Sequence, residues 1–363
     1  MGFKCGIVGL PNVGKSTLFN ALTNAGISAE NYPFCTIDPN VGVVGVPDER
    51  LQRLAALVKP QKVVPTPVQF VDIAGLVAGA SKGAGLGNQF LAHIRETQAI
   101  AHIVRCFRDQ NVVHVAGDVA PLADIETINT ELMLADIATV ERALERTTRR
   151  TKVGDKAALT LKAVLTQTMD RLNQGIAIRS GNFTAYELNL LDELNLITAK
   201  PMLYVANIDE SEINGNEQLK AVESLAEREG TAWVSVCAAI EAELADMEGK
   251  DRAQFLQDLG LPEPGLNRII RAGYGLLGLL TFFTASPKEV RAWTAPQGAK
   301  APQAAGVIHS DFERGFIRAE VTAFDDYMAL GGEQGAKVAG KLRLEGRDYV
   351  VQDGDVILFR FNV

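Results

Sequence analysis

The chain has 363 residues, of which 47 % are hydrophobic and 22 % charged, and its 44 acidic residues outnumber 36 Lys and Arg for a net charge of −8. This size predicts two or three domains, and the acidic balance argues against a protein whose whole surface clamps nucleic acid, though not against a local basic patch. With no signal-peptide pattern, no apolar run of about twenty residues and no C-x-x-C pair among its four cysteines, the sequence predicts a cytoplasmic protein without a membrane span, disulfide framework or zinc site.

A phosphate-binding loop is expected near the N-terminus. Residues 3–8 predict a buried strand, residues 9–16 read G-x-x-x-x-G-K-S, and a helix follows. In this context the backbone N–H groups wrap a polyphosphate, Lys15 reaches its β- and γ-phosphates, and the Ser16 hydroxyl holds Mg²⁺. The nucleotide-binding residues predicted here are Asn12, Val13, Gly14, Lys15, Ser16 and Thr17.

Strands and helices then alternate along the chain. A loop is predicted at 31–40, a strand at 41–46, an amphipathic helix at 48–59, a break at 60–67, a strand at 68–71, a mobile glycine-rich loop at 77–88, a helix at 89–97 and strands at 99–107, 201–206 and 232–236. This alternation predicts an α/β fold, with a parallel or mixed sheet and a nucleotide at the carboxyl edge of its strands.

Further residues complete a nucleotide-hydrolase set. Thr36 can join Ser16 on Mg²⁺, and Asp72 and Gly75 form D-x-x-G at a strand end, where the carboxylate would bind the ion and the Gly75 N–H the γ-phosphate. The next residue is Leu76, which cannot orient the attacking water as a Gln would. Candidates for that task are His114, although its spacing alone favours a structural role, and a monovalent cation held by Asn12.

The base-recognition segment departs from the N-K-x-D that guanine-binding proteins of this layout carry. Residues 207–210 read N-I-D-E, so Glu210 replaces the Asp and Ile208 the Lys. The longer carboxylate would misplace a bidentate bond to guanine. We expect adenine instead, contacted by Asn207 or backbone groups, with Ile208 packed on the ring and Cys237 and Ala238 lining the base loop.

A helical hairpin is predicted between the strands at 99–107 and 201–206. Residues 122–150 contain neither Gly nor Pro, and apolar residues recur at mostly three- and four-residue steps before and after a turn at 154–155. The tip carries Arg142, Arg146, Arg149, Arg150, Lys152 and Lys156. These cations fit either a solvated helix end or a basic contact with RNA or an acidic partner, and the second is favoured in an acidic chain.

From residue 279 onward short apolar runs surround one probable helix and predict a small β-grasp, ubiquitin-like module. His309 lies there without metal-ligand or triad spacing, which favours a structural hydrogen bond. The expected division is therefore a nucleotide-hydrolase domain at 1–121 and 200–278, a helical insertion at 122–199 and a C-terminal domain at 279–363.

Together these stretches resemble the Obg-like ATPases of the YchF subfamily, in GLPNVGKST, PFCTIDPN, DIAGLVAGASKGAGLGN, the N-x-x-E variant and AAGVIHSDFERGFIRAEV. The resemblance covers essentially the whole chain. It implies an OBG-type G domain, a coiled-coil insertion and a TGS domain, ATP hydrolysis in preference to GTP, and binding to the ribosome and its large subunit. It also implies that His114 is catalytic, that Asn12 binds an activating K⁺, and that Cys35 is redox-sensitive.

Three functions fit these expectations. The first is a slow Mg²⁺-dependent ATPase that acts as a conformational switch on the ribosome. The second is a GTPase of ribosome assembly. The third is a nucleotide-gated RNA- or ribosome-binding protein in which hydrolysis is secondary.

Overall fold

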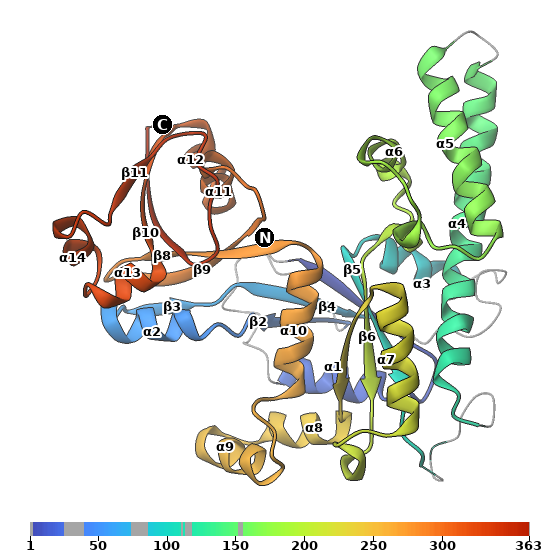
Figure 1. The fold of residues 1–363 in the computed structure, drawn as a ribbon, viewed down its shortest axis with the longest axis horizontal. Coiled ribbons are helices and arrows are strands. Elements are labelled where there is room, and N and C mark those ends of the chain that lie inside the picture. Colours follow the sequence, from blue (N-terminus) through green and yellow to red (C-terminus); the bar gives the residue numbers. More distant parts are fainter. Residues whose placement is uncertain are drawn as a thin grey trace.

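A computed structural model shows three parts, which Figure 1 displays as a central α/β domain, a projecting helical arm and a β-rich C-terminal domain. The structure describes residues 3–24, 40–73, 86–109, 112, 118–151 and 155–362. Within these ranges, no helix combines the length and the apolar character that crossing a membrane requires.

The central sheet has the strand order β2-β4-β1-β5-β6-β7. Its strands are β1 (Lys4–Val8), β2 (Val41–Gly45), β4 (Pro67–Asp72), β5 (Ala99–Arg105), β6 (Met202–Asn207) and β7 (Ala232–Val236). All neighbours pair in parallel except β2 and β4, so the sheet is mixed, as predicted. β5 and β6 are buried along their whole length, which is typical of strands covered on both faces.

The helices of this domain are α1 (Lys15–Asn24), α2 (Glu49–Val58), α3 (Leu86–Arg95), α7 (Glu217–Glu229), α8 (Ala238–Asp246), α9 (Gly249–Asp258) and α10 (Gly265–Leu276), with a 3₁₀ turn η6 (Glu210–Glu212). The predicted helix at 48–59 is confirmed: Asp48 caps its N-terminus, and Lys59 ends it in a left-handed conformation. The prediction of a loop up to residue 88 was wrong at its end, because residues 86–88 already belong to α3. The rest of that loop lies outside the described residues.

The arm is built from α4 (Pro121–Thr151) and α5 (Lys156–Asn173), and the returning chain contains α6 (Ala185–Leu191) and the 3₁₀ turns η3 (Ile178–Ser180), η4 (Asp192–Leu194) and η5 (Ile197–Ala199). α4 serves two cores. Its first half packs Ile125, Ile128 and Leu132 into the core of the central domain. Its second half packs Val140 and Ala143 against α5 and the returning chain.

The C-terminal sheet has the order β11-β10-β12-β8-β9-β3. Its strands are β8 (Leu279–Ala285), β9 (Glu289–Pro296), β10 (Phe316–Ala323), β11 (Arg343–Glu345) and β12 (Asp355–Phe361), together with β3 (Lys62–Val64). The helices here are α11 (Ala301–Ile308), α12 (Ser310–Arg314), α13 (Phe324–Ala329) and α14 (Glu333–Val338). The first and last long strands, β8 and β12, lie side by side in parallel, and α11 packs on the sheet. His309 is structural, as expected: its Nδ1 accepts the Asp311 N–H and caps α12.

The prediction that residues 60–67 only break the chain was wrong. β3 forms there and pairs in parallel with β9, residue 62 opposite Glu289 and residue 64 opposite Arg291. The partner strand lies more than two hundred residues away, so nothing in the local sequence indicates the pairing. Through β3, the central domain supplies an edge strand to the C-terminal sheet.

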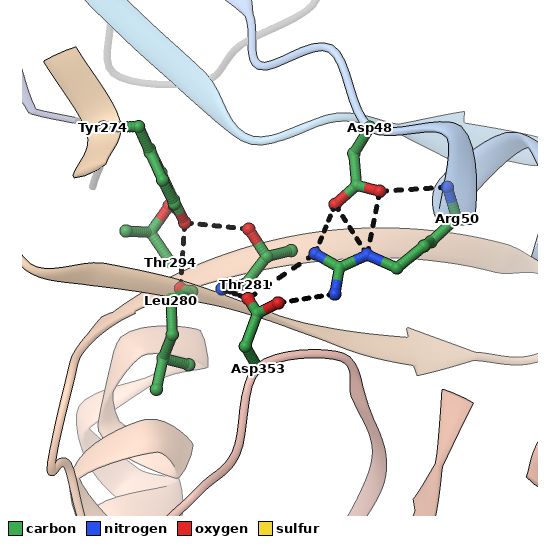
Figure 2. A network of polar contacts seen from close by, with 7 residues as sticks. All are labelled: Asp48, Arg50, Tyr274, Leu280, Thr281, Thr294 and Asp353. Carbon is green, nitrogen blue, oxygen red and sulfur yellow. Dashed lines mark hydrogen bonds and ion pairs between the residues drawn. The ribbon is translucent and has the colours of Figure 1, made fainter. Parts of the chain in front are cut away.

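A polar network ties the same two domains together (Figure 2). Arg50 of α2 donates to Asp48 at 2.8–3.2 Å and to Asp353 of the C-terminal domain at 2.6 Å. Asp353 also accepts the Thr281 N–H at 2.8 Å. The Tyr274 hydroxyl, at the end of α10, bonds the Leu280 carbonyl at 2.8 Å. The domain junction is therefore held by strand pairing and by charged hydrogen bonds.

Candidate nucleotide-binding site

The candidate site lies at the carboxyl edge of the central sheet. The phosphate-binding loop follows β1, Asp72 ends β4, Asn207 ends β6, and Cys237 follows β7. Since these strands run in parallel, their carboxyl ends meet at one edge. The phosphate-binding loop, Asp72, Asn207 and Cys237 therefore lie at the same edge of the sheet, as the sequence predicts.

The loop before α1 has a backbone that few residue types tolerate. Asn12 and Gly14 have φ values of 62° and 90°, in the left-handed region. A Cβ on Gly14 would lie 2.2 Å from the Asn207 side chain, and one on Gly9 would lie 2.7 Å from the Ile103 carbonyl. Glycine is required at both positions, because the loop passes so close to β5 and β6.

Lys15 and Asp72 form the charged centre of the site. Lys15 begins α1 and is 8 % exposed. Burial lowers the pKa of its ammonium group, and the charge of Asp72 opposes that shift. Burial likewise raises the pKa of Asp72, against the opposing charge of Lys15. A triphosphate would add negative charge beside Lys15, which favours the charged form of the lysine.

The residues present fit a magnesium ion. Asp72 Oδ1 is buried and has no hydrogen-bond partner in the described part of the chain. Ser16 is exposed at the start of α1. A carboxylate oxygen and a hydroxyl are hard oxygen ligands of the kind Mg²⁺ uses together with water and phosphate. Among the described residues, no group of three or more His, Cys, Asp and Glu side chains is arranged to hold a metal ion.

The Asn207 side chain makes two hydrogen bonds within the site. It is 4 % exposed, donates to the Val13 carbonyl at 2.9 Å and accepts the Ala238 N–H at 3.0 Å. The amide therefore ties the phosphate-binding loop to the loop after β7. The contact with adenine stays a prediction, because the amide keeps a second N–H and a second lone pair beside these two bonds.

The neighbouring residues divide between core and surface. Ile208, predicted to pack on the base, is 5 % exposed and belongs to the domain core. Asp209 accepts the Ser211 N–H and hydroxyl, and these bonds lower its pKa. Glu210 is exposed at the start of η6, and Asp209 before it is partly exposed.

The loop after β7 offers little side-chain surface. Cys237 is 7 % and Ala238 is 5 % exposed, and burial raises the pKa of the Cys237 thiol. The Cys237 side chain makes no capping bond at the start of α8. A base here would therefore meet backbone more than side chain.

Several predicted residues lie outside the described residues: Cys35, Thr36, Gly75, Leu76 and His114. Their roles stay predictions.

Sequence reasoning missed Arg105, the last residue of β5. It is 1 % exposed and donates to the carbonyls of Phe107, Asp109 and Val112 at 3.0–3.3 Å. It thereby organises the segment that leads toward His114. The signal was visible as the one charged residue in an apolar strand, but its partners are backbone groups, which carry no sequence pattern.

Comparison with known proteins agrees with this geometry. A family model described as a 50S ribosome-binding GTPase matches residues 4–136, and a C-terminal YchF-GTPase model, described as a protein of unknown function, matches residues 279–362. The curated proteins named ribosome-binding ATPase YchF from Haemophilus ducreyi and Bacillus subtilis are 61 % and 56 % identical, each match covering 100 % of both chains.

A solved structure extends the likeness to the fold. The structure of the Schizosaccharomyces pombe YchF GTPase superposes with a TM-score of 0.90 at 37 % identity, covering 99 % of this chain and 98 % of that one. The α/β architecture with its phosphate-binding loop is thus that of a P-loop nucleotide hydrolase, and the chain belongs to the YchF family.

Proposed function

We propose that this protein is a magnesium-dependent ATPase that binds the ribosome and switches conformation with its nucleotide. The observation that carries the proposal is buried Lys15 with half-buried Asp72, beside a loop with left-handed Asn12 and Gly14. Full-length relatives named ribosome-binding ATPase support it.

The chemistry would be in-line attack of water on the γ-phosphate. Lys15 and the loop N–H groups stabilise charge that develops on the phosphate oxygens. A bound Mg²⁺, held through Ser16, Thr36 and Asp72, supplies electrostatic stabilisation of the same charge. The Gly75 N–H bonds the γ-phosphate and so senses its presence.

Water orientation falls to His114, with K⁺ at Asn12 as an alternative. Arg105 supports the first choice, because it fixes the carbonyls just before that segment. Turnover of His114→Ala separates the two: a rate within twofold of wild type removes the histidine from the mechanism.

Adenine preference is proposed from Glu210 and from the backbone character of the loop at Cys237 and Ala238. The runner-up is a GTPase, which the name of the fungal relative, YchF GTPase, favours. Titration with ATP and with GTP decides between them, and GTP binding tenfold tighter than ATP would overturn the ATP proposal. Glu210→Asp is the informative variant, with a gain in GTP affinity expected; Ile208→Lys would place a charge in the core and is avoided.

The domain boundaries at 122, 200 and 279 are proposed together with the roles of the parts. The sheet order β9-β8-β12-β10-β11, with α11 crossing it, supports a β-grasp module of the TGS type. Arg142, Arg146 and Arg149 are exposed along the last turns of α4, which supports contact with ribosomal RNA, including that of the large subunit. A binding protein in which hydrolysis is secondary stays the third alternative, and nucleotide-independent ribosome binding would favour it.

The decisive test of the whole proposal is Lys15→Ala. We expect nucleotide binding and turnover to fall at least a hundredfold, while Lys59→Ala at the end of α2 leaves both unchanged. Wild-type binding and turnover in Lys15→Ala would show that the assigned loop is not the phosphate site.

A further inference from the structure

Arg95, the last residue of α3, touches both limbs of the helical insertion. Its guanidinium donates to the outgoing limb at the Ala135 carbonyl (3.3 Å) and the Thr139 hydroxyl (2.9 Å). It donates to the returning limb at the Leu194 (3.5 Å) and Asn195 (3.3 Å) carbonyls. One side chain therefore joins three separate segments of the chain.

A buried carboxylate reinforces this junction. Asp136 of α4 is fully buried and lies 3.8 Å from the Arg95 guanidinium. Its oxygens accept the Ile197 and Thr198 N–H groups at 2.9 and 2.7 Å, and the Thr198 hydroxyl at 2.7 Å. Asp136 thus links the two limbs of the insertion by hydrogen bonds, next to the place where Arg95 bonds both of them.

The return of the chain to the central sheet is fastened to α3 as well. The Lys200 ammonium donates to the Arg95 carbonyl at 3.0 Å and to the Thr97 carbonyl. A lysine at the last carbonyls of a helix also meets the negative end of its dipole. The end of α3 is therefore bonded to the insertion through the Arg95 side chain, and to Lys200 through the Arg95 carbonyl.

Arg95 contacts α4 at the point where this helix passes from the core of the central domain to the core of the hairpin. Ala135 is the last α4 residue in the core of the central domain, and Val140 begins the fully buried part of the hairpin core. Arg95 binds the carbonyl of Ala135 and the side chain of Thr139, between those two positions. A force applied there acts at the base of the arm, where a small rotation becomes a large displacement at the far end of α4. Figure 1 shows α3 lying beside α4 below the projecting part of the arm.

We propose that Arg95 is a latch that transmits the position of α3 to the helical arm, so that the arm responds to the nucleotide. The proposal rests on the proposed function, because α3 is the helix that follows the D-x-x-G segment beginning at Asp72. A guanidinium suits the task, since its fork bonds several carbonyls at once in fixed geometry. The coupling requires that α3 occupy different positions with ATP and with ADP.

The test is amide hydrogen exchange of the full-length protein with ADP or with a non-hydrolysable ATP analogue. The reporting amides are those of Ile197 and Thr198, which bond Asp136. In wild type we expect their exchange rates to differ at least fivefold between the two nucleotides. In Arg95→Gln we expect the difference to shrink below twofold, with both nucleotide affinities within twofold of wild type.

Two further variants keep the test interpretable. Arg95→Gln leaves the Asp136 charge without its ion pair. The second variant is therefore Arg95→Lys, which keeps a cation beside Asp136 but lacks the guanidinium fork, and it is expected to lose the difference too. The control is Arg171→Gln on α5, whose guanidinium lies 5.2 Å from the Phe183 ring within the arm; it should keep the wild-type difference.

Each other outcome counts against the proposal. A nucleotide-dependent difference that persists in both Arg95 variants shows that coupling bypasses the latch. Wild-type protein that binds both nucleotides with the same exchange pattern shows that the arm does not respond, and leaves the ATPase proposal intact. Absence of nucleotide binding in wild type overturns the proposed function and the latch with it.

Discussion

At the residue scale, Asn207 shows how a side chain placed in a recognition motif can hold the site together. It bonds the Val13 carbonyl on one side and the Ala238 N–H on the other. Both partners are backbone groups next to buried side chains, and a lost partner there costs about 1–3 kcal/mol. The position of the phosphate loop relative to the base loop depends on this amide.

We predict that Asn207→Ala weakens ATP and GTP binding by the same factor, about tenfold or more. An equal loss follows because the residue orders the loop and does not read the base. Isothermal titration with both nucleotides checks this, with Asn173→Ala, exposed at the end of α5, as the control. A loss confined to one nucleotide would assign Asn207 to the base after all.

His102 on β5 should make the protein sensitive to acid. It is 1 % exposed, and burial lowers its pKa from 6.5 to about 3, with the charge of Arg179 acting in the same direction. Between these two pKa values the imidazole is protonated in the unfolded chain but neutral in the folded protein. The free energy of unfolding therefore falls as the pH falls. The slope from this one group is at most about 1.4 kcal/mol per pH unit.

We predict that His102→Phe, which keeps a ring beside Tyr204, unfolds with a weaker pH dependence than wild type between pH 6.5 and pH 4. Urea denaturation at several pH values gives the two slopes. Equal slopes would show that the imidazole does not titrate on unfolding.

At the element scale, α2 follows β2 of the central sheet and packs on the C-terminal sheet. Leu51 and Leu54 pack with Phe283 and Val290 of the C-terminal sheet. Arg50 bridges Asp48 and Asp353 (Figure 2) and lies 5.4 Å from the Phe283 ring. Burial lowers the pKa of Arg50, but its bonds to the two carboxylates outweigh this and raise it overall. The cation is therefore retained at the junction.

We predict that Asp353→Ala lowers the free energy of unfolding by about 1–2 kcal/mol, because Arg50 and the Thr281 N–H both lose an acceptor. The matched control is Asp348→Ala in the same domain, since Asp348 is 94 % exposed and pairs only across the surface with Lys300. Urea unfolding of both variants gives the comparison. Equal losses would mean that the Arg50 network adds nothing beyond a surface pair.

At the scale of the whole molecule, the cations of the arm form a stripe along α4. Arg142, Arg146, Arg149 and Arg150 follow helical spacing, and Arg142 lies nine residues before the end of α4 at Thr151, about 14 Å at the rise of an α-helix. The cations predicted at the tip of the hairpin therefore extend along the last turns of α4 as well. Arg150 is engaged with Asp155 at 2.7 Å, which leaves the other three as the better candidates for phosphate contact.

We predict that reversing Arg142, Arg146 and Arg149 to Glu abolishes ribosome binding in sedimentation at moderate salt and leaves ATP affinity unchanged. Each phosphate contact removed reduces the slope of log binding constant against log salt concentration by about one. Arg228→Glu on α7, also exposed, is the control for charge alone. Wild-type binding with unchanged salt dependence would refute the basic contact.

The sequence by itself determined the local features. The G-x-x-x-x-G-K-S string between a strand and a helix, the helix at 48–59, and the helical period from residue 122 onward each depend on near neighbours. Such features are fixed by glycine conformation, capping and hydrophobic period, all of which act within a few residues. The alternation of strands and helices then predicted the mixed sheet.

Tertiary structure decided what joins distant parts of the chain. It placed β3 on β9, turned Asn207 toward Val13, buried Ile208 in the core and brought Arg95 to both limbs of the arm. In each case the partner is far along the chain, and in most it is a backbone carbonyl or amide. Backbone groups are the same in every residue, so no sequence pattern records which of them a side chain will meet.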